Sequence, residues 1–227
     1  MVDPSSHVSA NAAQALFGFV QFAAKLKSVP RTGWLDRGLD SLRVESVADH
    51  SFGVALLAWV CALQRHAEGA AIDPERVLKL AIIHDLAEAE TGDSTPYDRA
   101  AIPSEHNPAA RRAFLETRHS RDSGRRAAKR ADEDAVMRTL LAALPGAMRS
   151  TLGEFWDELH QGESPEARFV KQVDRLETFL QSRFYLDTDP TLPMASFRQE
   201  VLETIDDPLL AAIRDEALSA DSSGDTK

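Results

Sequence analysis

The apolar residues of this chain recur mainly every three or four positions, which is the spacing of a helical face. In the first such segment, residues 11–28, the positions that share a face are Leu16, Phe19, Val20, Ala23 and Leu26. Pro30 ends this pattern, and Gly33 and Gly38 interrupt any periodicity over residues 31–43. We therefore predict a helix followed by a loop.

Two further helices carry recognisable start signals. Ser46 followed by Asp49 is a capping-box pattern, and it predicts a helix that runs to about residue 66. Asp73 and Pro74 supply an N-cap and a first-turn proline, so a third helix is expected from there to about residue 91. Similar signals and periodicity predict helices at residues 131–144, 149–159, 165–180 and 197–205, with a short one from residue 208.

Between and beyond these helices the pattern weakens. Residues 93–130 are rich in charge and punctuated by prolines and a glycine, which predicts a loop and a partly exposed helix. Residues 1–10 and 219–227 carry no apolar periodicity and are expected to be flexible. Neither a repeat nor a convincing strand is present in the sequence. We predict an all-α fold, a helical bundle formed by a single domain over residues 11–218.

Composition narrows the class of protein. A chain of 227 residues with 43% hydrophobic and 27% charged residues fits one globular domain. The net charge of −10 argues against binding along a nucleic-acid polymer, and the one basic cluster, residues 111–130, also contains acidic residues and is interpreted as a solvated surface. Cys61 is the only cysteine, which excludes a cysteine-based zinc site. Because neither a long apolar stretch nor a secretion signal is present, we expect a cytoplasmic protein without a membrane segment.

The candidate chemistry lies where three ionisable residues break an apolar helix. His84, Asp85 and Glu88 follow a run of apolar residues that is expected to be buried. Burying their charges without a partner would be costly, whereas a divalent cation offsets that cost. A lone histidine in this setting would more often be a hydrogen-bonded core residue. Neighbouring His and Asp side chains converge on one ion only if the end of the helix is shaped for it.

Two more residues complete a candidate ligand set. His50 lies near the start of the second helix, and Asp174 lies among apolar residues of the helix from residue 165. On its own, Asp174 would be expected to pair with Lys171 or Arg175. Together with His84 and Asp85, these residues offer two imidazoles and two carboxylates, a mixed set that suits Mn, Co, Mg, Fe or Zn.

The order His, His-Asp, Asp on successive helices resembles the signature of the HD-domain phosphohydrolases. More specifically, residues 45–50, 83–88, 92–96 and 169–174 resemble the matching blocks of the HD-domain-containing 5′-deoxynucleotidase family, and residues 31–34 resemble its eukaryotic-type branch. The resemblance covers about residues 17–185. It implies an HD-domain helical bundle and a metal-dependent phosphohydrolase that forms a homodimer.

The resemblance also implies roles for individual residues. The positions that match the metal ligands are His50, His84, Asp85 and Asp174. Glu88 and Asp93 match acidic catalytic residues, which in the closer branch also hold a second cation together with the backbone carbonyl matching Ser94. Arg31 matches a phosphate-binding arginine, and Trp34 matches a tryptophan that packs on the sugar, although an aromatic lid on the core is an equal alternative for Trp34.

This sequence departs from the family pattern in two places. Residues 97–130 contain an arginine-rich insertion with His106 and His119, both interpreted as surface residues because neither has a partner at ligand spacing. Ser94 stands where the family usually has an aliphatic residue.

The activity implied is removal of phosphate from nucleoside or deoxynucleoside 5′-monophosphates, a small-molecule nucleotide substrate. No nucleophile elbow, phosphate loop or cysteine motif suggests a covalent route. Two alternatives stay open. One is another HD-type reaction, cleavage of a nucleoside triphosphate or of an alarmone pyrophosphate. The other is a non-catalytic metal- or nucleotide-binding regulatory protein.

Overall fold

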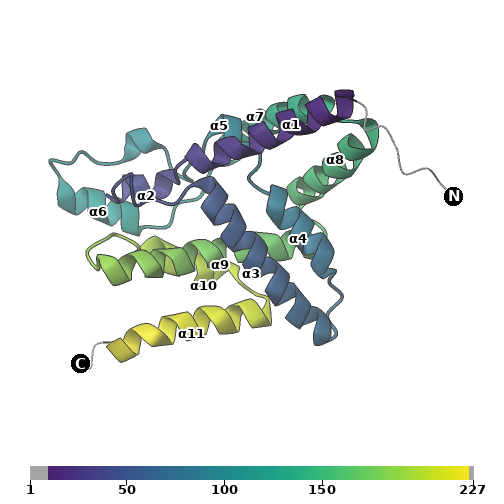
Figure 1. Ribbon diagram of the computed structural model, residues 1–227. Coiled ribbons are helices and arrows are strands. Elements are labelled where there is room, and N and C mark those ends of the chain that lie inside the picture. The colour runs from purple at the N-terminus through teal and green to yellow at the C-terminus, as the bar shows by residue number, and fades with distance from the viewer. Residues whose placement is uncertain (1–9, 225–227) are drawn as a thin grey trace.

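Three helices form the centre of the bundle: α3 (Val47–Ala67), α4 (Pro74–Ile83) and α9 (Pro165–Thr188) pack against one another (Figure 1). Their facing residues, among them Val54, Leu80 and Val173, are fully buried and belong to one hydrophobic cluster. The structure, a computed structural model, describes residues 10–224, and no strand occurs within that range. The predicted all-α helical bundle is therefore confirmed.

The remaining elements surround this centre. In Figure 1, α1 and α7 lie along one side of the bundle, and α10 and α11 lie along the opposite side. The bounds of the remaining elements are α1 Ala10–Ala24, η1 Lys25–Ser28, α2 Thr32–Asp36, α5 Glu88–Thr91, η2 Arg99–Ala101, α6 Pro108–Glu116, α7 Ser123–Ala142, α8 Gly146–Gln161, α10 Ala195–Thr204 and α11 Pro208–Gly224.

Both predicted start signals are confirmed. The hydroxyl of Ser46 accepts a hydrogen bond from the backbone N–H of Asp49 at 3.2 Å, and the Asp49 carboxylate accepts one from the Ser46 N–H at 2.8 Å. Asp73 accepts hydrogen bonds from two backbone N–H groups at the start of α4. The capping box determines where α3 begins, and therefore places His50 in its first turn.

The prediction that the third helix continues to residue 91 is wrong. The α-helix ends at Ile83, a tight turn covers residues 84–87, and the short helix α5 follows. Within the turn, the Leu86 N–H donates to the Ile83 carbonyl at 3.1 Å, a spacing tighter than that of an α-helix. The turn places His84 and Asp85 at the end of α4, immediately before α5.

Two further boundaries need correction. Residues 31–43, predicted as a loop, contain the short helix α2. Residues 93–130 contain a loop and a partly exposed helix, α6, as predicted, but α7 begins at Ser123 rather than near residue 131. Asp122 caps α7 by accepting from the Arg125 N–H at 2.9 Å. Alanine and arginine favour a helix, and Gly124 lies at its start, where a glycine costs little. The many charged residues of this segment led to its prediction as a loop despite its helical propensity.

The last helix is longer than the sequence suggests. α11 extends through Gly224, so the polar residues from Ser219 onward are helical where a flexible tail was predicted. The flexible N-terminal segment predicted over residues 1–10 falls almost entirely outside the described residues. Among residues 10–224, α3 is the one helix long and apolar enough to span a bilayer, and in the structure it packs on α4, α9 and α11.

Candidate metal centre and its pocket

His50 is the most buried member of the predicted ligand set, with no exposed surface. Its Nδ1 lies 2.6 Å from a carboxylate oxygen of Glu177, and its Nε2 lies 3.1 Å from Asp174 Oδ1. Burial of His50 and the nearby charge of Arg31 favour a lower pKa, but hydrogen bonds with Asp174 and Glu177 outweigh them and raise the pKa to about 10. The carboxylate of Glu177 therefore orients the ring so that Nε2 faces the other ligands.

His84 and Asp85 meet His50 from the turn after α4. Asp85 Oδ2 lies 3.2 Å from His84 Nε2 and 3.7 Å from His50 Nε2. The other ring nitrogen of His84, Nδ1, lies 2.8 Å from the carbonyl of Ala81, which accepts its hydrogen bond, so Nε2 is the nitrogen that faces Asp85. Burial opposes ionisation of Asp85, but the positive charges of His84, His50 and Arg31 in the metal-free protein hold its pKa well below its usual range.

These residues fit a divalent cation. The Nε2 atom of His84 is buried and has no hydrogen-bond partner in the protein, as expected of a nitrogen that serves a metal. Potential ligand atoms of His50, His84 and Asp85 all lie within 4.8 Å of one another, and Asp174 reaches His50 from α9. The structure therefore brings His50, His84 and Asp85 together and places Asp174 beside His50.

Glu88 follows directly at the start of α5 and is 3% exposed. One carboxylate oxygen, Oε1, lies 3.0 Å from Lys129 Nζ on α7, and the other, Oε2, is buried without a hydrogen-bond partner. Burial and the charge of Asp85 raise the pKa of Glu88 to about 8, against the opposing effect of Lys129.

Asp93 is directed back toward the same site by the turn at Gly92. Gly92 adopts φ 75°, a left-handed conformation that favours glycine, and ends α5. The Asp93 carboxylate then accepts a hydrogen bond from the Thr32 N–H at 2.5 Å and lies 3.5 Å from Arg31 Nη1. Arg31 Nη1 is also 3.9 Å from Asp85 Oδ2, so the predicted phosphate-binding arginine lies beside the candidate metal ligands.

Trp34 and Ser94 lie on the wall of the adjoining pocket. Trp34 is 1% exposed, packs against Tyr185 and Phe197, and donates from Nε1 to Glu45 at 2.8 Å. This is the environment of a core residue with one edge at the pocket. The carbonyl and the hydroxyl of Ser94 both accept hydrogen bonds from Arg121.

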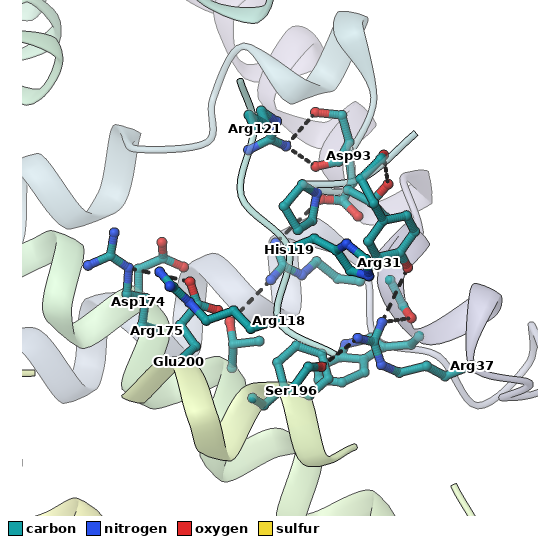
Figure 2. A pocket seen from close by; sticks show the side chains of 18 of the residues that line it. Arg31, Arg37, Asp93, Arg118, His119, Arg121, Asp174, Arg175, Ser196 and Glu200 are labelled. Atoms are coloured by element: carbon teal, nitrogen blue, oxygen red, sulfur yellow. Dashed lines mark hydrogen bonds and ion pairs between the residues drawn. The ribbon is translucent and has the colours of Figure 1, made fainter. Parts of the chain in front are cut away.

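The pocket beside the candidate metal ligands has a volume of about 310 Å³. In Figure 2, Asp174, Arg175 and Glu200 lie on one side of it, and Arg121 and Asp93 lie on another. Arg118, His119 and Arg121 also line the pocket, so the interpretation of the basic cluster as a solvated surface holds only for its exposed members, such as Arg112 and Arg126. His119 packs against Phe114 and Tyr97. His106 is exposed, as predicted.

Sequence reasoning missed Glu177, Lys129 and Thr32. Glu177 lies three residues after Asp174 on α9, so the shared helical face was a signal that could have identified it. Lys129 carried no such signal because it is one of many basic residues in the inserted segment. Thr32 acts through its backbone N–H, which side-chain chemistry does not reveal.

The model of the HD-domain family matches residues 23–206 of this chain. Among characterised proteins, human 5′-deoxynucleotidase HDDC2 is 34% identical over 185 residues, which cover 82% of this chain and 75% of the human protein. The 5′-deoxynucleotidase hdd1 of Schizosaccharomyces pombe is 28% identical over 176 residues, which cover 75% of this chain and 73% of that protein.

Solved structures support the same fold. A conserved hypothetical protein from Pyrococcus furiosus matches with a TM-score of 0.65 and 25% identity, covering 89% of this chain and 99% of that one. A protein from Magnetospirillum magnetotacticum, described as a predicted metal-dependent phosphohydrolase, matches with a TM-score of 0.58 and 22% identity over 92% of both chains. The ordered motifs, the ligand geometry and these similarities together show that the chain belongs to the HD-domain family, among the relatives of 5′-deoxynucleotidase HDDC2.

Proposed function

We infer that this protein is a metal-dependent phosphohydrolase that removes phosphate from nucleoside and deoxynucleoside 5′-monophosphates. The observation that carries this conclusion is the placement of the buried Glu88 carboxyl group beside the His50, His84 and Asp85 cluster, at the edge of a pocket lined by Arg31. Pure metal storage would require the ligands but not a neighbouring acid or an arginine. The identity of its relatives supports the nucleotide substrate.

In this reaction, water attacks phosphorus, the bond from phosphorus to the 5′-oxygen breaks, and the nucleoside leaves with a proton on that oxygen. When bound by His50, His84, Asp85 and Asp174, a divalent cation (Mn, Co, Mg, Fe or Zn) neutralises phosphate charge and acidifies a water molecule. Arg31 orients the phosphate through its planar guanidinium.

Two acidic residues have separate roles in this reaction. Glu88, whose pKa is raised by burial and by the charge of Asp85, is suited to deliver a proton to the departing oxygen. Asp93, held by Thr32 and Arg31, orients the attacking water. No covalent intermediate is needed, because phosphoryl transfer depends mainly on positioning and electrostatic stabilisation.

A direct test is phosphate release measured with each candidate metal across deoxy- and ribonucleoside 5′-monophosphates, nucleoside triphosphates and an alarmone. We expect inorganic phosphate from monophosphates only in the presence of a divalent ion. Release of pyrophosphate or triphosphate, with monophosphates untouched, would instead support another HD-type reaction. Tight metal binding without any release would support the regulatory alternative.

Arg31 should contribute to substrate binding rather than to metal binding. Replacing it in Arg31→Ala removes a charged hydrogen-bond donor, which is worth about 1.5–3 kcal/mol and corresponds to a loss of about 10- to 100-fold in kcat/KM. Arg31→Lys should recover part of this loss, because it restores the charge without the planar fork. Steady-state kinetics with metal analysis checks this. Unchanged kcat/KM, or loss of the metal ion, would rule out the proposed role.

We propose that the protein is a cytoplasmic homodimer with no membrane contact. The dimer is supported by the α3 apolar face, a set of exposed residues at helical spacing: Phe52, Leu56, Trp59, Val60 and Leu63. Apolar patches of this kind on a helix that already packs on α4 and α9 mark contact surfaces. A second copy of the same face would cover it through a two-fold axis.

The variant Leu56→Glu is expected to convert the dimer to a monomer, because it places a charge at the centre of the α3 apolar face. Leu42→Glu is the matched control, since Leu42 is 94% exposed in a turn away from α3. Light scattering after size-exclusion chromatography measures the mass. A monomeric wild-type protein, or a dimeric Leu56→Glu variant, would contradict this proposal.

A further inference from the structure

The two places where the sequence departs from the family pattern contact each other. Arg121, from the inserted segment (residues 97–130), donates from Nη2 to the Ser94 hydroxyl at 2.9 Å and also contacts the Ser94 carbonyl (Figure 2). An aliphatic residue at position 94 would offer only the carbonyl. The serine and the inserted arginine therefore form one unit at the edge of the pocket.

The same carbonyl is one of three groups expected to hold a second cation, and each of the three is already engaged. The Ser94 carbonyl contacts Arg121, and the Glu88 carboxylate lies 3.0 Å from Lys129 Nζ. The Asp93 carboxylate accepts from the Thr32 N–H and lies 3.5 Å from Arg31. Three positive side chains therefore reach the oxygens that a second ion would require.

The grouping of histidine and carboxylate side chains that could share one ion also bears on the second site. Within residues 10–224, the histidine and carboxylate groups close enough to share an ion are His50 with His84 and Asp85, and His50 with Glu45 and Glu177. Asp174, Glu88 and Asp93 lie outside both groups. What sets Glu88 and Asp93 apart is that Lys129 and Arg31 already contact their carboxylates, and these positive charges disfavour a second ion.

We propose that Arg121 and Lys129 replace the second cation in this protein. Both belong to the inserted segment, so one stretch of the chain brings two positive charges to the reaction centre. A fixed ammonium and a fixed guanidinium stabilise negative charge on the phosphate, as a bound ion would, but they require no free metal. A divalent ion among them would be repelled by each. This inference rests on the proposed metal-dependent function.

Counting Mn²⁺ ions per chain tests the proposal. The wild-type protein, dialysed against Mn²⁺ up to millimolar concentration, is expected to hold one ion by metal analysis and by the paramagnetic signal of bound Mn²⁺. Arg121→Ala and Lys129→Met should each gain a second ion. The affinity of that site should rise about 10-fold or more, which is the effect of one unit charge about 6 Å from a divalent ion in a water-like dielectric.

Two further variants make the comparison specific. Ser94→Ala keeps the carbonyl but removes the hydroxyl that holds Arg121, so it should strengthen the second site in the same direction. Arg138→Ala is the charge-matched control, because Arg138 is exposed on the same helix, α7, and does not line the pocket. It should retain one ion.

The outcomes are distinguishable. Two ions in the wild-type protein would overturn the proposal while leaving the proposed function intact. One ion in the wild type and in both Arg121→Ala and Lys129→Met would also overturn it, because these side chains would then not exclude the second ion. A wild-type protein that binds no Mn²⁺ would overturn the metal-dependent function itself.

Discussion

Asp85→Ala is expected to lose the bound metal ion and, with it, all measurable phosphate release. The Asp85 carboxylate lies within 4 Å of both imidazole Nε2 atoms, and it is the ligand that joins His50 to His84. Without it, two buried imidazoles face each other with less negative charge to hold a cation between them. Metal analysis and phosphate release on one preparation check both effects.

Thermal stability provides an independent measurement. An ion present at 100 times its Kd stabilises the folded protein by about 2.7 kcal/mol, and for a chain of this size that corresponds to a rise in Tm of about 5–10 °C. A chelator should therefore lower the Tm of the wild type and leave Asp85→Ala unchanged. Glu105→Ala, which removes an exposed carboxylate, is the control and should behave as wild type. An Asp85→Ala variant with normal metal content and turnover would show that the site is elsewhere.

Glu88→Ala is expected to keep the metal ion and lose about 100-fold or more in kcat, the effect typical of a missing general acid–base residue. Glu88 lies on α5, after the turn, and its carboxylate is hydrogen-bonded to Lys129 rather than to a ligand histidine. Removing the carboxylate should therefore leave the four ligands in place. Nucleotide binding should also persist, since Arg31 is untouched.

Glu90→Ala is the matched control for this experiment. Glu90 lies on the same short helix, but its side chain is 56% exposed and pairs with Lys25 instead of facing the pocket. Its turnover should remain close to wild type. Near-normal turnover in Glu88→Ala would remove this residue from the mechanism, and loss of the ion from that variant would make it a ligand instead. Metal analysis, nucleotide binding and phosphate release together separate these results.

Much of the fold could be predicted because its signals are local. Helical periodicity, the capping box at Ser46 and the first-turn prolines depend on residues a few positions apart, and the structure confirms them. The errors lie at two helix boundaries. The helix that was predicted to continue past His84 ends at Ile83, and the helix predicted to begin near residue 131 begins at Ser123.

The sequence by itself determined the helical class, the start of α3 and the residue types able to bind a divalent ion. Only the tertiary structure decided how those residues converge. Glu177 orients His50 across 127 positions, and Lys129 reaches Glu88 across 41. Such contacts depend on how α3, α7 and α9 pack, and no local pattern records them. His84 and Asp85 are adjacent in the chain, but only the tertiary structure shows that both side chains approach His50.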